Sequence, residues 1–331
     1  MSPTEPAAAR IAWIGGPVLE AVTEDPRGLS VNEAVEIGRD RLLGEVLQLD
    51  GRTARVQVYE DTTGLRPGDP VHGTGRPLSI PLGPGLLGRI FDGLLRPLTP
   101  AESPWLAPGM VRAEDTRARF SPLVSEGDAL SPGQPFGTVA PERGPELEAL
   151  TPHDARGTVR SIAAEGEVGD RQTVCEIETE DGGTRELSLT QDWPVRIPRP
   201  AAERLPADAP LLTGQRIIDG LFPVARGSKA AMPGGFGTGK TVLQQSLAKW
   251  CDADVIVYVG CGERGNEMTG VLEEFPELED PRTGRPLMER SVIIANTSNM
   301  PVAAREASIY TGVTIAEYFR DMGLDAALMA D

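Results

Sequence analysis

The run from Gly234 to Thr241 constrains the fold of this chain more than any other feature of its sequence. It reads Gly-Gly-Phe-Gly-Thr-Gly-Lys-Thr, which is the pattern G-x-x-x-x-G-K-T of a phosphate-binding loop. Glycines let the backbone curl so that successive N–H groups point at one anion, without bulky side chains in the way. A helix that starts after such a loop directs its positive end at the phosphates. The pattern therefore predicts a site for a nucleoside triphosphate.

Several residues in and after this loop have expected roles. Lys240 can reach the β- and γ-phosphates of ATP, or the β-phosphate of ADP, and the Thr241 hydroxyl can coordinate Mg²⁺. The residues expected to contact the nucleotide are Gly234, Gly235, Phe236, Gly237, Thr238, Gly239, Lys240, Thr241 and Val242. The residues expected on one face of the following helix are Val242, Leu243, Ser246, Leu247 and Trp250. This helix pattern disfavours the alternative, a glycine-rich turn that matches the motif by chance.

The composition limits the class of protein and of partner. The 331 residues carry a net charge of −17, which argues against nucleic acid as the main partner. No apolar run approaches the roughly 20 residues that cross a bilayer, and Met1–Arg10 lacks the pattern of a signal peptide. Cys175, Cys251 and Cys261 have unrelated spacings, which indicates reduced thiols in a cytosol rather than a disulfide framework or a zinc site.

The first part of the chain has the pattern of an all-β domain. Residues 1–10 are expected to be a disordered leader, and residues 11–78 contain short β-like runs broken by turns. Two of these runs, Leu43–Leu49 and Ala54–Tyr59, flank an Asp-Gly pair, which is a strong hairpin signal. We therefore expect residues 11–78 to form an N-terminal antiparallel β-barrel.

A second β-rich stretch follows. Residues 79–112 are rich in proline and glycine, and we expect them to begin a nucleotide-binding domain. In residues 113–193 the β pattern returns, for example where Thr173–Thr179 alternates between polar and apolar side chains. We expect this stretch to be a β-rich module inserted into that domain. Trp193–Pro200 is then a stiff, proline-rich connector.

Residues 194–331 have an α/β pattern and continue the predicted phosphate-loop domain. Val255–Val259, Ser291–Ala295 and Ala326–Ala330 are short apolar runs, typical of strands buried on both faces of a parallel sheet. Ala303–Met322, between the last two runs, has the pattern of a long helix. Such sheets bind ligands at the carboxyl ends of their strands. The chain as a whole is therefore expected to be of mixed β and α/β class.

Two carboxylates follow these predicted strands. Glu263 comes just after the first strand and Asp331 directly after the third. In phosphate-loop enzymes a glutamate at such a place can polarise the attacking water, and an aspartate can help to hold Mg²⁺. Alternatively, Glu263 forms an ion pair with Arg264 or Arg305 that only stabilises the end of the strand. Position alone does not decide between these two roles.

Several motifs together resemble the catalytic A subunit of the V/A-type rotary ATPases. The stretches that carry the resemblance are Gly73–Leu78, Leu82–Gly88, Leu212–Arg216, Gly234–Thr241, Tyr258–Met268, Asn296–Tyr310 and Ala327–Asp331. The resemblance implies an N-terminal β-barrel, an α/β nucleotide-binding domain and a β-rich bulge inserted before the phosphate loop. Residues 113–193 fit that bulge.

The resemblance also implies an activity and a set of site residues. The family hydrolyses or synthesises ATP with Mg²⁺, coupled to the transport of H⁺ or Na⁺ across a membrane. By position, Lys240, Glu263 and Arg264 are then catalytic, Glu263 by activating water and Arg264 by supporting the site. Thr241 and Asp331 serve Mg²⁺. The resemblance thus favours the catalytic role of Glu263 over the ion pair.

Partners follow from the same resemblance. In this family, A subunits alternate with B subunits in a hetero-hexameric ring, and the B subunit supplies an arginine finger to the catalytic site. Central-stalk and peripheral-stalk subunits complete the complex, which meets the membrane only through its ion-translocating sector. We therefore expect a cytoplasmic protein, peripheral to the membrane, that does not bind nucleic acid.

Family members continue past the position of Asp331, with the rest of the sheet, an adenine pocket and a helical domain. We therefore expect a truncated form with an incomplete sheet, inactive in isolation. One alternative is another enzyme on the same core, a hexameric helicase or a secretion-system ATPase; the inserted module and the net charge argue against the helicase. The other is a non-enzymatic nucleotide-binding scaffold of the ring, which the intact Lys240, Thr241 and Glu263 disfavour.

Overall fold

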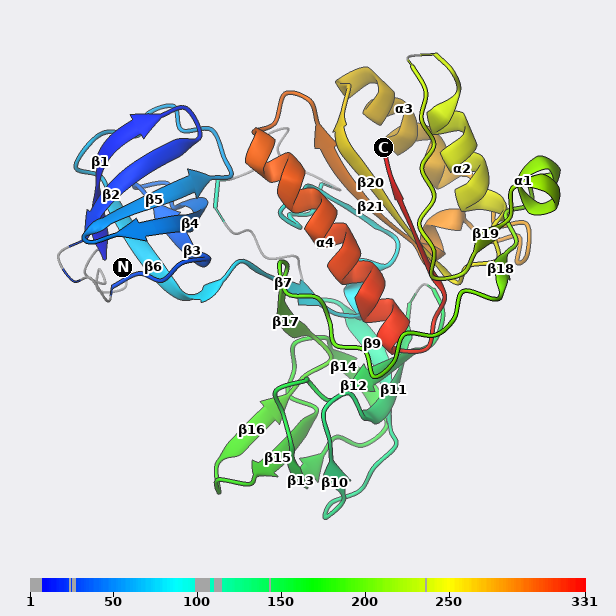
Figure 1. Cartoon of the computed structure of the whole chain (residues 1–331). Helices are drawn as coiled ribbons and strands as arrows, with labels where there is room; N and C mark the ends of the chain where they lie inside the picture. The colour runs from blue at the N-terminus through cyan, green and yellow to red at the C-terminus, as the bar shows by residue number, and fades with distance from the viewer. Residues whose placement is uncertain are drawn as a thin grey trace.

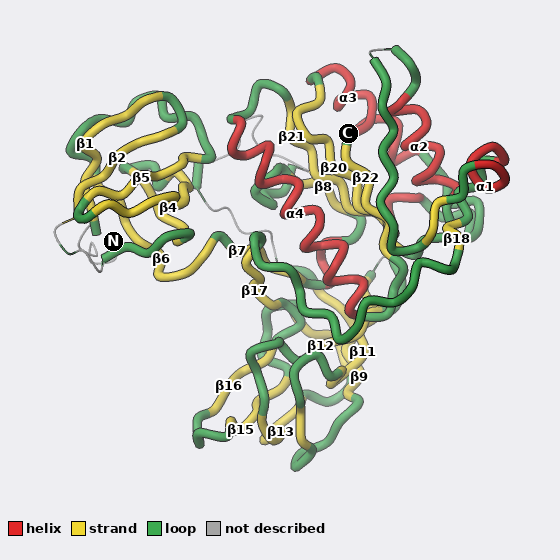
Figure 2. The backbone as a smooth tube through the Cα atoms, viewed as in Figure 1, coloured by secondary structure: helices red, strands yellow, loops and turns green. Residues whose placement is uncertain are grey.

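The computed structural model describes residues 8–23, 25, 28–98, 108–109, 115–142, 144–235 and 237–331. It has three bodies: an N-terminal β-barrel, a β-rich module, and a parallel sheet flanked by helices (Figure 1). Figure 2 shows that the long helices of the described residues belong to the third body, while the first two consist of strands and loops. The predicted mixed β and α/β class is therefore confirmed.

The N-terminal body is a closed antiparallel barrel with the strand order β1-β2-β5-β4-β3-β6. Its described strands are β1 (Ala9–Gly15), β2 (Val18–Thr23), β3 (Glu33–Ile37), β4 (Leu42–Asp50), β5 (Thr53–Val58) and β6 (Pro70–Pro77). Alternate side chains point into the barrel, where Leu19, Val46 and Val56 are fully buried. The predicted hairpin is confirmed, because Asp50 pairs with Thr53 across the β4–β5 turn.

The barrel begins earlier in the sequence than expected. Ala9 and Arg10, which were expected in the leader of residues 1–10, belong to β1 and pair with Val71 and Pro70 of β6. These two residues form the seam that closes the barrel, so their backbone is held by strand pairing. Residues 1–7 of the expected leader lie outside the described residues, and Ala8 directly precedes β1.

The β-rich module has two four-stranded antiparallel sheets within its described residues, in the orders β10-β13-β15-β16 and β12-β11-β9-β14. The strands are β9 (Arg117–Pro122), β10 (Ala129–Leu130), β11 (Pro135–Pro141), β12 (Leu147–Leu150), β13 (Gly157–Ile162), β14 (Gly166–Gly169), β15 (Cys175–Thr179) and β16 (Thr184–Leu187). The chain leaves the module through β17 (Gln191–Pro194), which pairs with β7 (Ser79–Leu82), a strand that comes before the module in the sequence. Part of the predicted connector, Trp193 and Pro194, is therefore a strand.

The third body is a parallel sheet with the order β22-β20-β21-β8. Its strands and flanking helices are β8 (Arg89–Phe91), β20 (Val255–Glu263), β21 (Ser291–Thr297), β22 (Ala326–Ala330), α2 (Lys240–Trp250), α3 (Gly265–Glu274) and α4 (Val302–Asp321). In Figure 1, α4 crosses one face of the sheet, and α2 and α3 lie on the other. Side chains of β20 alternate accordingly: Val257 joins the core on the α4 side, and Ile256 and Tyr258 join the core on the α2 and α3 side. The three strands and the long helix predicted for this region are confirmed.

The remaining elements of the described residues are short. They are β18 (Pro210–Leu211), α1 (Arg216–Leu221), β19 (Val224–Ala225) and the 3₁₀ turns η1 (Pro84–Leu86), η2 (Phe275–Glu277) and η3 (Leu287–Arg290). Among the helices of the described residues, none has both the length and the apolar character needed to span a bilayer.

The buried face of α2 differs from the expected one. Gln244, Leu247 and Ala248 are its buried residues, whereas Val242 and Trp250 are 66% and 50% exposed. The helix packs near β22, at the edge of the sheet, rather than over its middle. The side of α2 that carries Val242 and Trp250 therefore has little protein to cover it. The helical period in the sequence was correct, but it does not reveal which face has a neighbour.

Candidate functional site

The predicted phosphate loop lies directly before α2, with Lys240 as the first residue of the helix. Gly239 is the N-cap residue and has a left-handed backbone with φ of 85°. Residues with a side chain rarely adopt this conformation, which explains why glycine precedes the lysine of the motif. The Thr238 hydroxyl donates a hydrogen bond of 2.8 Å to the carbonyl oxygen of Gly235, which stabilises the curl of the loop. Phe236, also expected to contact nucleotide, lies outside the described residues.

The loop is largely open to solvent. The glycines at 234, 235, 237 and 239 are exposed, as is Thr238, and Lys240 and Thr241 are half-buried. Val242 is 66% exposed, so its side chain points away from the sheet. The backbone N–H groups at the start of α2 have no partner within the helix, because the first turn of a helix always leaves such donors. These donors, the Lys240 ammonium and the helix dipole together favour an anion at this place.

Glu263 is the last residue of β20 and reaches the site through a β-bulge. The pairing of β20 with β21 shifts between Cys261 and Glu263, and Gly262 between them has φ of 88°. A Cβ atom on Gly262 would lie 2.8 Å from the Cδ atom of Arg305, so a larger residue would require Arg305 to move and would strain the backbone. The backbone N–H of Ser298 donates a hydrogen bond of 2.7 Å to the carbonyl oxygen of Glu263. The bulge and this hydrogen bond together fix the end of the strand and therefore the position from which the Glu263 side chain projects.

Asp331 is held beside the same strand by its backbone. Its N–H donates a hydrogen bond of 3.0 Å to the oxygen of Val259, and its carbonyl oxygen accepts one of 2.7 Å from the N–H of Cys261. Its side chain lies at the start of α2, where the Thr241 Oγ1 donates a hydrogen bond of 2.8 Å to the Asp331 Oδ2. The structure thus brings together the two residues expected to serve Mg²⁺.

The surroundings of Glu263 raise the pKa of its carboxyl group to about 7. Burial is the largest cause, followed by a hydrogen bond with the Glu267 side chain and by the negative charges of Asp331 and Glu267. The Lys240 ammonium acts in the opposite direction. Lys240 and Asp331 therefore both act on the charge of Glu263, although the three residues are far apart in the sequence.

Glu267 is a site residue to which the sequence analysis assigned no role. It lies in the first turn of α3, four residues after Glu263. The sequence does contain a signal for this contact, because two glutamates four residues apart can meet where a strand passes directly into a helix. The missing information was that α3 starts immediately after the strand, at Gly265.

Arg264 lies at this strand–helix junction. It is the N-cap residue of α3, with an extended backbone, and its carbonyl oxygen accepts a hydrogen bond of 2.9 Å from the N–H of Met268. Its side chain is exposed. Arg305, the other arginine considered as a partner for Glu263, has a buried Nε atom without a hydrogen-bond partner. The supporting role expected of Arg264 stays a prediction.

The oxygen atoms of Thr241 and Asp331 suit Mg²⁺. This ion prefers hard oxygen ligands, and in nucleotide sites it is usually held by one or two protein groups together with phosphate oxygens and waters. A hydroxyl and a carboxylate that already share a hydrogen bond at the start of the phosphate-loop helix fit that requirement. The arrangement can therefore bind a metal–triphosphate complex and present a carboxyl group that titrates near neutral pH.

Three family models match successive parts of the chain. The ATP synthase alpha/beta family β-barrel domain matches residues 11–75, and the barrel-sandwich domain of that family matches residues 113–196. The nucleotide-binding domain of the ATP synthase alpha/beta family matches residues 214–331, which contain the phosphate loop, Glu263 and Asp331.

Curated relatives give a consistent result. The chain is 54% identical to the A subunit of the A-type ATP synthase of Methanopyrus kandleri, over 97% of this chain and 55% of the relative. It is 51% identical to that of Haloferax volcanii, over 97% of this chain and 55% of the relative. It therefore spans about half the length of the curated relatives that it matches. Among solved structures, it is similar to the assembled ATPase EscN of the enteropathogenic E. coli type III secretion system, with a TM-score of 0.60 and 25% identity, over 98% of this chain and 56% of that chain.

Proposed function

Because this chain belongs to the ATP synthase alpha/beta family, we propose that it acts as the catalytic, nucleotide-binding A subunit of an A-type (V/A-type) rotary ATPase. In this role it hydrolyses or synthesises ATP with Mg²⁺, coupled to the transport of H⁺ or Na⁺. Identity to the A subunit of A-type ATP synthases is 54% for the first relative named above, against 25% for the secretion-system ATPase. This difference favours the rotary enzyme over a secretion-system ATPase on the same core.

The observation that carries the proposal is the hydrogen bond between Thr241 and Asp331. It joins the first turn of the phosphate-loop helix to the end of a parallel strand. The carboxyl end of that strand is where such sheets bind ligands. A glycine-rich turn that matched the motif by chance would have no reason to lie against a carboxylate 90 residues further along the chain.

Each site residue has a role in this proposal. The backbone N–H groups of residues 234–242 and the Lys240 ammonium bind the phosphates. Thr241 and Asp331 would hold Mg²⁺, which neutralises phosphate charge when bound. Glu263 orients the attacking water and accepts its proton, for which a pKa of about 7 is well placed. Arg264 supports the strand end from which Glu263 projects.

The partners belong to the proposal as well. We place the chain next to a B subunit in an alternating ring, with an arginine of the B subunit completing the site. Such an arginine is worth roughly 10³–10⁵ in rate in related phosphoryl-transfer systems. Central-stalk and peripheral-stalk subunits would link the ring to the ion-translocating sector, with the chain on the cytoplasmic side of the membrane. Its net charge of −17 supports the exclusion of nucleic acid as a partner.

The test of the proposal is the variant Glu263→Gln in the full-length protein, assembled in a ring with the B subunit. The amide preserves the size of the side chain but cannot accept the proton, so we expect Mg-ATP binding to persist and hydrolysis to fall about 10²–10⁴-fold. Glu273→Gln, at an exposed position of the helix that follows, is the matched control and should hydrolyse ATP at the parent rate. Turnover near the parent level in Glu263→Gln would give Glu263 a structural role instead.

A further inference from the structure

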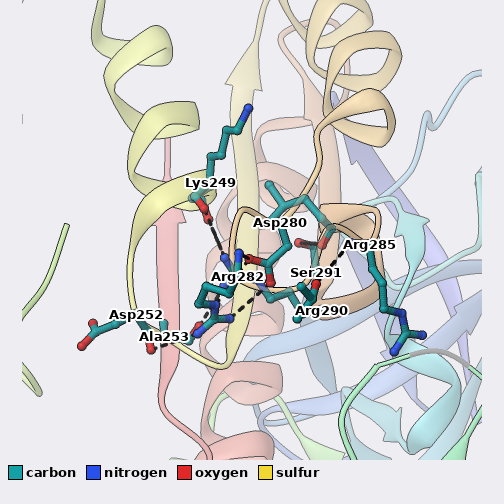
Figure 3. A network of polar contacts seen from close by, with 11 residues as sticks. Lys249, Asp252, Ala253, Asp280, Arg282, Arg285, Arg290 and Ser291 are labelled. Carbon is teal, nitrogen blue, oxygen red and sulfur yellow. Dashed lines mark hydrogen bonds and ion pairs between the residues drawn. The ribbon is translucent and has the colours of Figure 1, made fainter. Parts of the chain in front are cut away.

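Arg290 is a buried arginine that the proposed mechanism does not use. It is the last residue of η3, directly before β21, and it is 6% exposed. Figure 3 shows its guanidinium group at the centre of a network of polar contacts. Its Nη1 atom donates a hydrogen bond of 2.8 Å to the carbonyl oxygen of Ala253. Its Nη2 atom donates to the carbonyl oxygens of Ala248 and Lys249, at 3.3 and 3.4 Å.

Ala248 and Lys249 lie in the last turn of α2. The last carbonyl groups of a helix have no partner within the helix, and they form its negative end. Arg290 supplies both a donor and a positive charge at this end. The opposite end of the same helix, about 15 Å away at 1.5 Å per residue, carries Lys240 and Thr241.

Asp280 holds Arg290 in place. The Arg290 Nε atom lies 2.9 Å from the Asp280 Oδ2, and both side chains are almost completely buried. The backbone N–H of Arg282 donates a hydrogen bond of 3.0 Å to the Asp280 Oδ1. Asp280 also anchors its own loop, because its carbonyl oxygen accepts a hydrogen bond of 2.7 Å from the N–H of Gly284. A buried arginine with a buried aspartate and three carbonyl oxygens keeps a single orientation.

The rest of α2 is weakly held. Of its eleven residues, all of which the structure describes, three are buried. Residues 227–235, which lead into it, are exposed except for the half-buried Met232. Arg226, just before them, is held by ion pairs with Asp252 and Asp325. The helix therefore depends on its C-terminal attachment more than a helix over the middle of a sheet does.

We propose that Arg290, oriented by Asp280, is a positioning residue for the phosphate loop. It attaches the C-terminal end of α2 to the loop before β21, and because a helix moves as a rigid rod, this attachment determines where Lys240 and Thr241 lie. The inference rests on the proposed function, since it assigns Arg290 to the same nucleotide site. It differs from a simple packing role in predicting an effect at the far end of the helix.

Two variants of the full chain test this inference. Arg290→Lys keeps the buried charge beside Asp280, but an ammonium group cannot reach all three carbonyl oxygens in the same geometry. The double variant Arg290→Met with Asp280→Asn removes both charges, so it leaves no unpaired ion in the interior. The matched control is Arg285→Lys, because Arg285 lies in the same loop but pairs with Glu289 at the surface.

The first measurement is amide hydrogen exchange in the absence of nucleotide. Loss of the attachment should raise exchange in residues 243–247, the first hydrogen-bonded amides of α2, by about tenfold in both variants. Amides of β21 (residues 292–295) should exchange as in the parent. If exchange rose by the same factor in β21, or stayed at the parent level in α2, Arg290 would be a packing residue and the inference would be wrong.

The second measurement is the affinity for Mg-ATP at a temperature where all variants are folded. We expect it to fall about tenfold in both variants and to stay at the parent value in Arg285→Lys. Parent affinity in both variants would overturn the inference. If the full-length parent, assembled in a ring with the B subunit, does not bind Mg-ATP, the proposed function fails, and the exchange measurement alone then decides whether Arg290 positions α2.

Discussion

The Oγ1 hydroxyl of Thr241 donates a hydrogen bond of 2.8 Å to the Oδ2 atom of Asp331. This bond connects the first turn of α2 to the residue that follows β22, and the backbone of Asp331 is in turn hydrogen-bonded to β20. The helix that begins at the phosphate loop is therefore linked to the sheet at both ends, by Thr241 here and by Arg290 at the other end. The nucleotide site is defined by these two attachments as much as by the loop itself.

Removal of the Thr241 hydroxyl should weaken Mg-ATP binding. Thr241→Val has the same shape but neither donates to Asp331 nor coordinates a metal, so we expect affinity for Mg-ATP to fall about tenfold or more. Binding of ATP without Mg²⁺ should change much less. Thr241→Ser, which keeps the hydroxyl, is the control and should bind nearly as the parent does. Equal Mg-ATP affinities for the valine and serine variants, measured by calorimetric titration, would contradict a metal role for Thr241.

Mg-ATP should protect the phosphate loop from hydrogen exchange. The backbone N–H groups of residues 234–241 become donors to phosphate when nucleotide binds, so their exchange slows. Lys240→Ala should abolish this protection at the same nucleotide concentration, whereas Lys229→Ala, at an exposed position before the loop, should retain it. A Lys240→Ala protein that binds as tightly as the parent would show that the loop is only a turn.

Loss of the Glu267 carboxyl should shift the pH dependence of catalysis. Burial, the hydrogen bond with Glu267 and the charges of Asp331 and Glu267 raise the pKa of Glu263 to about 7. Glu263 accepts a proton only when it is ionised, so kcat/KM of the assembled parent enzyme should rise with pH through about 7. In Glu267→Gln this rise should move to lower pH. An unchanged pH profile would show that Glu267 does not act on Glu263.

The same pKa shift predicts how the stability of the nucleotide-free protein depends on pH. The pKa of Glu263 in the folded protein, about 7, lies above its ordinary value of 4.5. The folded protein therefore favours the protonated carboxyl group. The contribution of this group to the free energy of unfolding is fully present below pH 4.5 and is lost as the pH rises through about 7. Glu263→Gln should melt at a higher temperature than the parent at pH 8, and the difference should shrink at pH 5. The effect is modest, because the carboxyl is partly exposed. A difference in melting temperature between Glu263→Gln and the parent that is the same at pH 5 and pH 8 would contradict the raised pKa.

A polypeptide of these 331 residues should hold its nucleotide core loosely. Within the described sheet β22 is an edge strand, its residues are at most half-buried, and a cleft of about 550 Å³ lies beside it. An open edge and a poorly covered strand open easily. We expect limited proteolysis to cut first between Asp254 and Asp331 and to spare the barrel, with weak ATP affinity and negligible turnover. Resistance throughout that region, together with appreciable hydrolysis by the isolated polypeptide, would refute this expectation.

The sequence by itself determined the local features of this protein. The glycine pattern before Lys240, the Asp-Gly turn between β4 and β5, and the apolar runs of β20, β21 and β22 depend on preferences within a few residues of one another. Backbone conformation and side-chain alternation are properties of such short stretches. They can therefore be inferred without knowledge of the rest of the chain, and they were sufficient to predict the fold class and the phosphate loop. The roles expected of Glu263 and Arg264 came from the family resemblance.

Only the tertiary structure decided which of these stretches meet. The closure of the barrel through Ala9, the pairing of β7 with β17, and the buried face of α2 all depend on neighbours far away in the sequence. The same holds for the contacts of Arg290 with the end of α2 and for the effect of Glu267 on Glu263. The energy of a buried ion pair, and the pKa of a carboxyl group, depend on which groups surround them and how much water remains. Those surroundings exist only once the chain has packed.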